Sequence, residues 1–135
     1  MSDILFDNTK LASYFLWEYT KGENALSLWV CAEDIAHYLE TTGIFSSGQI
    51  DYIKNKGIYS YEYIGFVRHI AYRIYIYTNN CDAEYNWFSA EKLLCNGEWC
   101  AAVTQIAKIF YENQSNFDLL QGVRSDVVRK SHSNT

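Results

Sequence analysis

The histidines are the first place to look for metal or acid–base chemistry in this chain. His37, His69 and His132 are scattered, and none has a second histidine or a cysteine one helical turn away. Zinc ligands on a helix typically share a face at i and i+4, so this spacing predicts no metal site. We expect His69 to be a solvated or capped residue on a helix surface. The sequence indicates no cofactor.

Adjacent carboxylates at Glu33 and Asp34 are the next candidates. Neighbouring side chains on a helix point about 100° apart, so they cannot act together on one substrate atom. We expect a solvated acidic edge there. The chain also has no G-x-S-x-G, P-loop or dinucleotide-binding pattern. The sequence therefore predicts a protein that supplies no catalytic residues of its own.

The elements that would position any functional residue are helices. Apolar residues recur at i, i+3, i+4 and i+7 in three segments, spanning residues 25–39, 63–77 and 99–110. Shorter helices are predicted over Leu11–Tyr19 and Ser89–Cys95. "YRIYIY" has strand-like composition, but it continues the second stripe without a break, so we interpret it as helix. The fold class is all-α, a helical bundle.

Composition limits the partners. The 135 residues carry a net charge of −5, and the segment after Gly122 is basic, which leaves −7 on residues 1–122. An acidic body argues against nucleic acid. No segment is long and apolar enough to insert into a membrane. Asp3 and Asp7 interrupt any N-terminal signal sequence, so we expect a cytoplasmic protein whose four cysteines are free thiols.

Asn24 stands directly before the first apolar stripe and is suited to be its N-cap. The segment around it, "YFLWEYTKGENALSLWVCAEDI", also resembles the regulator of G-protein signalling (RGS) family. Two further segments, "RIYIYTNNCDAEYNWFSAEKLL" and "WCAAVTQIAKIFYENQSNFDLL", resemble that family in the same order. The resemblance covers about Leu5 to Gly122.

The resemblance implies an RGS-like bundle of about nine helices over residues 1–122, with a four-helix bundle as its larger part, and a polar tail over 123–135. It implies binding to a heterotrimeric G-protein α subunit in its transition-state-like form, which would bring the domain to the inner face of the plasma membrane. Such domains clamp the switch loops so that the α subunit's own glutamine and arginine hydrolyse GTP.

Partner-binding residues follow by resemblance. Glu23 and Asn24 match the family's Glu-Asn pair if the turn before the helix holds an insertion; an ungapped match back from Trp29 would place Ala25 there instead. Asn86 matches the asparagine of the turn after the Ile-Tyr helix. The family's last-turn aspartate falls on Asn113 or Gln114, and its arginine falls near Asp118, which reverses the charge. Each lost charge-assisted hydrogen bond costs about 1.5–3 kcal/mol.

Two alternatives stay open. An RGS-homology domain without GTPase-activating activity could serve as a protein-interaction scaffold, because the last-turn acid and arginine are missing. A different small helical bundle could bind partner helices through an aromatic groove, since the chain holds 12 Tyr, 7 Phe and 4 Trp.

Overall fold

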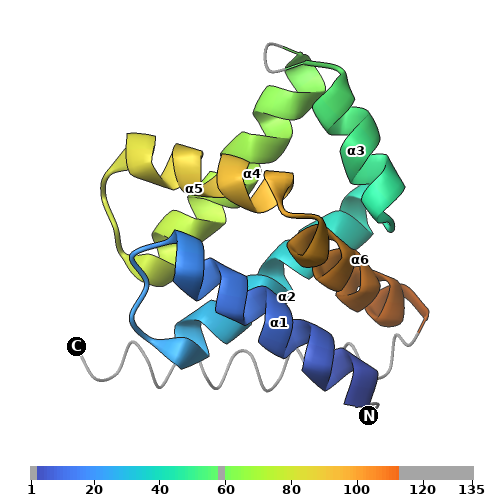
Figure 1. Ribbon diagram of the computed structural model, residues 1–135, viewed down its shortest axis with the longest axis horizontal. Coiled ribbons are helices and arrows are strands. Elements are labelled where there is room, and N and C mark those ends of the chain that lie inside the picture. Colours follow the sequence, from blue (N-terminus) through green and yellow to red (C-terminus); the bar gives the residue numbers. More distant parts are fainter. Residues whose placement is uncertain (1–2, 58–59, 113–135) are drawn as a thin grey trace.

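The computed structural model describes residues 3–57 and 60–112, and those residues form six helices and no strand (Figure 1). The all-α class is therefore confirmed. The helices are α1 (Asp3–Tyr19), α2 (Ala25–Thr42), α3 (Ser47–Asn55), α4 (Tyr61–Thr78), α5 (Ala83–Cys95) and α6 (Gly97–Glu112). None of these six combines the length and apolar character of a membrane span. Residues 113–122 of the expected domain and its tail, 123–135, lie outside the described residues.

Helix α2 begins and ends where its sequence dictates. The Oδ1 atom of Asn24 accepts hydrogen bonds from the main-chain N–H groups of Leu26 (3.0 Å) and Ser27 (3.2 Å), so Asn24 is the predicted N-cap. At the other end Gly43 has a φ of 81° and donates its N–H to the carbonyl of Glu40. Glycine takes this left-handed conformation without a steric penalty, which is why α2 stops there.

The three apolar stripes form the core. Within α2 the side chains of Leu28, Ile35 and Leu39 are fully buried. Trp29 belongs to the same stripe by spacing but is only half-buried, and its ring lies 5.2 Å from that of Phe6 in α1. The "YRIYIY" segment is helical, as predicted, and lies in the second half of α4.

Three parts of the helix prediction need correction. Helix α1 begins at Asp3, eight residues before the predicted start, and α5 begins at Ala83 rather than near Ser89. Helix α3 was not predicted, because its nine residues bury a single side chain, Ile50, and show no long stripe. It is set locally instead: Ser46 caps it, and the side chain of Gln49 accepts from the N–H of Phe45 at 2.6 Å.

The helices pack as two connected groups. Helices α1, α2 and α6 lie against one another, while α4 pairs with α5 and also packs on α2. Helix α3 contacts α4 and α6 at the edge of the molecule (Figure 1). This arrangement places the α1–α2 turn beside the α4–α5 turn, although 50 or more residues separate them in the sequence. Two of the three segments that carry the family resemblance are thus neighbours.

Candidate functional site

The α1–α2 turn (residues 20–24) and the α4–α5 turn (residues 79–82) form one surface, which we call the two-turn surface. The ammonium of Lys21 lies 4.4 Å from the ring centroid of Tyr85, in the first turn of α5. A Cβ atom on Gly22 would lie 2.7 Å from Leu28 and 3.0 Å from Thr78, so position 22 admits only glycine without a shift. This close approach packs the α1–α2 turn against the last residue of α4, directly before the α4–α5 turn.

Both turns are closed by the same local device. The hydroxyl of Thr20 donates to the carbonyl of Leu16 and accepts from the N–H of Gly22. The hydroxyl of Thr78 donates to the carbonyl of Ile74 and accepts from the N–H of Asn80. A threonine at the end of each helix thus satisfies a helix carbonyl and fixes the path of the chain leaving it.

Glu23 and Asn24 both lie exposed on the two-turn surface. Within the described part of the chain, the carboxylate of Glu23 makes no hydrogen bond or ion pair. The oxygen of the Asn24 side chain is committed to the α2 cap, whereas its NH₂ group has no acceptor among the same residues. Glu23 can therefore accept from a partner, and Asn24 can still donate to one.

Asn86 is placed differently from the sequence expectation. It lies within α5, not in the turn before it, and only 2% of its surface is exposed. Its Nδ2 donates to the main-chain carbonyl of Asn80 at 2.6 Å, which ties α5 to the α4–α5 turn. Asp82 caps α5 by accepting from the N–H of Tyr85 at 3.0 Å. In this structure Asn86 is a buried residue that holds the α4–α5 turn in place.

The other three predicted site residues, Asn113, Gln114 and Asp118, lie outside the described residues. The structure does place the last turn of α6 that precedes them. Tyr111 packs on Phe45, with ring centroids 4.8 Å apart, in the connection between α2 and α3. That connection follows the C-terminal end of α2, whereas Asn24 caps its N-terminal end. At 1.5 Å per residue, the 18 residues of α2 separate the two places by roughly 27 Å.

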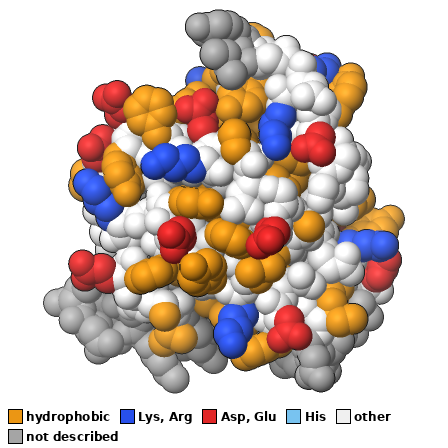
Figure 2. Space-filling model, viewed as in Figure 1, with side chains coloured by type: hydrophobic (Ala, Val, Ile, Leu, Met, Phe, Trp, Pro, Cys, Tyr) orange, Lys and Arg blue, Asp and Glu red, His pale blue; other side chains and the backbone are white. Residues whose placement is uncertain are grey.

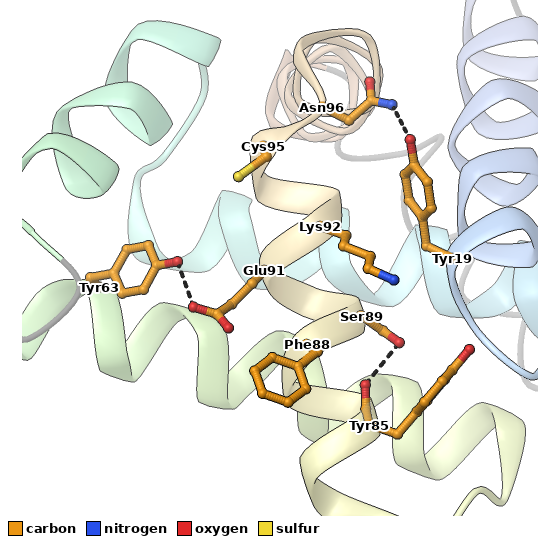
Figure 3. A pocket seen from close by; sticks show the side chains of 9 residues that line it. All are labelled: Tyr19, Tyr63, Tyr85, Phe88, Ser89, Glu91, Lys92, Cys95 and Asn96. Carbon is orange, nitrogen blue, oxygen red and sulfur yellow. Dashed lines mark hydrogen bonds between the residues drawn. The ribbon is translucent and has the colours of Figure 1, made fainter.

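A pocket of about 870 Å³ adjoins the two-turn surface along α5 (Figure 3). It is lined by Tyr19, Tyr63, Tyr85, Phe88, Ser89, Glu91, Lys92, Cys95 and Asn96. The pocket was missed at the sequence level because its residues come from three helices. The one available signal was the surplus of tyrosine.

Two hydrogen bonds connect the α5 side of this pocket to the neighbouring helices α4 and α1. The phenol of Tyr63 donates to Glu91 at 3.1 Å, and the side chain of Asn96 donates to the phenol oxygen of Tyr19 at 3.0 Å. Burial, followed by the hydrogen bond to Glu91, raises the pKa of Tyr63 to about 12. Phe88 is 51% exposed at the mouth and offers apolar surface to a partner. These features suit contact with another protein.

The two-turn surface is acidic. Together with the adjoining helix ends, it exposes one base, Lys21, and four acids, Glu18, Glu23, Asp82 and Glu84. Figure 2 shows the same face of the molecule as Figure 1. Hydrophobic side chains in the region of α5 are interspersed there with acidic and basic ones. A positively charged partner surface would be attracted here, and salt would weaken that attraction.

The residues considered first for chemistry take structural roles. Glu33 is buried, and Asp34 accepts from the phenol of Tyr77 at 3.2 Å, so the expected solvated acidic edge is wrong. The exposed ring of His69 stacks on Tyr38 at 4.9 Å. In the described ranges, no three His, Cys, Asp or Glu side chains gather as a metal site would require.

All four cysteines are free thiols, as predicted. Cys31 and Cys100 are buried, and burial raises the pKa of Cys100 to about 11. A thiol with a raised pKa is a weak nucleophile at neutral pH, so these two side chains serve packing.

Comparisons with known proteins do not extend these findings. No family model matches the chain, and neither the search of curated proteins nor the search of solved structures finds a match.

Proposed function

We propose that this chain is an RGS-type domain that binds the switch regions of a heterotrimeric G-protein α subunit and accelerates its GTP hydrolysis. The observation that supports this most is the packing of the α1–α2 turn against the helix ends that flank the α4–α5 turn, with Lys21 over Tyr85 of α5 and Gly22 against Thr78 of α4. The family resemblance assigns partner contacts to these same two segments. The RGS-like bundle of about nine helices, the 1–122 boundary and the cytoplasmic location at the membrane face belong to the same proposal.

The proposed mechanism needs no acid or base from this chain. GTP hydrolysis in α subunits uses their own glutamine and arginine, and a partner accelerates it by holding the switch loops in the reactive geometry. The two-turn surface offers a free acceptor at Glu23 and a free donor at Asn24. Because Thr20, Thr78 and Asn86 fix the turns beforehand, little conformational entropy would be lost on binding.

A second candidate is a binding scaffold that does not activate GTP hydrolysis. One observation favours it: the Asn86 carboxamide is buried and bonded to Asn80, so it is not on the surface where a switch loop could reach it. In that case the α5 pocket, with Tyr19, Tyr85 and Phe88, would supply the partner contacts.

Binding of the whole chain to a panel of α subunits separates these functions. Each α subunit is loaded with GDP alone and with GDP plus aluminium fluoride, and single-turnover GTP hydrolysis is followed in parallel. We expect tight binding to the fluoride form and faster hydrolysis. Binding to both forms without acceleration would favour the scaffold. No binding to any α subunit would contradict the proposed function.

Variants at Asn24 distinguish a role in partner contact from a role as the N-cap of α2. Serine keeps the N-cap but lacks the NH₂ group, so Asn24→Ser should retain stability while losing α-subunit affinity. Asn24→Ala should lose both, with a destabilisation of about 1 kcal/mol. Gln105→Ala, an exposed amide on α6, is the matched control and should change neither. Unchanged affinity in Asn24→Ser would leave Asn24 as a helix cap alone.

A further inference from the structure

The outward side of α1 is rich in apolar residues, although it faces solvent. The opposite side packs into the core through residues such as Leu5 and Leu16. On the outward side, Phe6, Tyr14 and Trp17 are 56%, 51% and 55% exposed. A surface helix normally carries polar residues on its outer side, and a helix that is apolar all round is normally buried. The outward side of α1 therefore has the composition of a contact surface.

These aromatic side chains belong to one continuous surface, which we call the α1 patch. The ring centroids of Tyr14 and Trp17 lie 6.3 Å apart. A hollow of about 320 Å³ connects these two residues to Leu26 and Trp29 in the first turns of α2. The ring of Phe6 lies 5.2 Å from that of Trp29 and extends the patch toward the start of α1.

The size of the α1 patch fits a protein interface. Burying an aromatic side chain removes about 150–250 Å² from water, so the three half-exposed aromatic residues of α1 present about 300 Å². Ile4, Leu11 and Leu26 are 58%, 37% and 59% exposed. They raise the apolar area toward about 600 Å², the upper end for one patch on a monomer. Each side of a standard interface buries roughly 800 Å², polar rim included, so the patch with its rim is large enough.

The charges on α1 make the patch complementary to itself. Lys10 and Glu18 lie four residues before and four residues after Tyr14, on the same side of the helix. Neither forms an ion pair with another described residue. If two copies of α1 cross antiparallel at Tyr14, Lys10 of each copy meets Glu18 of the other. Asp7 then falls opposite Lys21, so every facing pair of charges is attractive.

We propose that the α1 patch binds the same patch of a second copy of this chain. The two α1 helices run antiparallel and cross at Tyr14, which places both copies about a two-fold axis. Two ion pairs between Lys10 and Glu18 flank the crossing, and Leu11 of each copy faces Trp17 of the other. This inference does not rest on the proposed G-protein function. Its test needs no α subunit, so the two can fail separately.

Sedimentation equilibrium of the full chain, from micromolar to millimolar concentration, tests the dimer. Lys10→Glu and Glu18→Lys should each weaken it about tenfold, because each turns two attractive pairs into repulsive ones. The double variant K10E/E18K exchanges the charges and restores both pairs, so its affinity should return to within about twofold of wild type. Lys108→Glu, an exposed charge reversal on α6, is the control and should change nothing.

A cysteine at the crossing tests the geometry. Tyr14→Cys, in a chain whose exposed Cys81 and Cys95 are replaced by serine, should form an intermolecular disulfide with oxidised glutathione, because position 14 faces its own copy. Lys108→Cys in the same chain should not. A chain that stays monomeric at every concentration would overturn the proposal and leave the patch to residues 113–135 or to another protein. A dimer that the charge reversals leave unchanged, or that Tyr14→Cys does not cross-link, would overturn it too.

Discussion

At the scale of single residues, the fold uses different atoms of Asn24 and Asn86, the two described asparagines that the family resemblance assigns to the partner. Asn24 commits its oxygen to the α2 cap and keeps its NH₂ group exposed. Asn86 commits its NH₂ group to Asn80 and keeps a buried oxygen without a donor. The two side chains therefore differ in which partner atoms they can bind, despite identical chemistry.

We expect the main role of Asn86 to be the stability of the fold, not direct contact with a partner. Asn86→Ala removes the hydrogen bond to the Asn80 carbonyl and should lower the free energy of unfolding by about 1–3 kcal/mol. Chemical denaturation measures this, with Glu84→Ala on the exposed side of α5 as the control. An unchanged melt together with lost α-subunit binding would instead make Asn86 a partner contact, and would contradict its structural role.

Tyr63 should make the stability of the protein depend on alkaline pH. Its pKa is raised from the ordinary 10 to about 12, first by burial and then by the Glu91 hydrogen bond. The folded state thus holds the phenol proton more tightly than the unfolded state. The resulting stabilisation is complete below pH 10 and is lost as pH rises through 12.

Denaturation of wild type and Tyr63→Phe across this pH window measures the effect. Phenylalanine has no proton to lose, so the variant should lose less stability than wild type between pH 10 and pH 12. Tyr61→Phe is the control, because Tyr61 is 93% exposed, and it should follow wild type. Parallel curves for Tyr63→Phe and wild type would show that the phenol is not stabilised in its neutral form.

At the scale of helices, two tryptophans on comparable apolar stripes differ in burial. Trp99 in α6 is fully buried, whereas Trp29 in α2 is half-buried and packs on Phe6 of α1. Trp99→Ala should cost about 3–5 kcal/mol, and Trp29→Ala should cost clearly less. Urea unfolding midpoints of both variants check the order. An equal or larger loss for Trp29→Ala would mean that the α1–α2 contact is more tightly packed than its exposure indicates.

At the scale of the whole molecule, candidate binding features lie in more than one place. The two-turn surface and the α5 pocket adjoin each other through Tyr19 and Tyr85. The last described turn of α6 contacts Phe45, roughly the length of α2 away from Asn24. A partner that contacts both regions must span α2, whereas one that uses the two-turn surface and the α5 pocket need not. The α-subunit binding panel, with hydrolysis followed in parallel, tests which of these two contact geometries a G-protein α subunit uses.

Much of this architecture could be predicted from the sequence because its causes are local. The periodicity of apolar residues predicted α2, α4 and α6, and Asn24 before a stripe predicted its own capping role. The starts of α1 and α5 could not be placed, since their first turns expose residues such as Ile4 and Glu84 and carry no continuous stripe. A short helix such as α3 depends on side-chain bonds that periodicity does not report.

By itself, the sequence determined the all-helical class, the capping of α2 and the free state of the four thiols. Only the tertiary structure decided which surfaces exist. The contact between Gly22 and Thr78, the burial of Asn86 and the gathering of Tyr19, Tyr63 and Tyr85 in one pocket all join residues distant in the chain. Local propensity is set by neighbours within a few positions, whereas these contacts depend on how the helices pack.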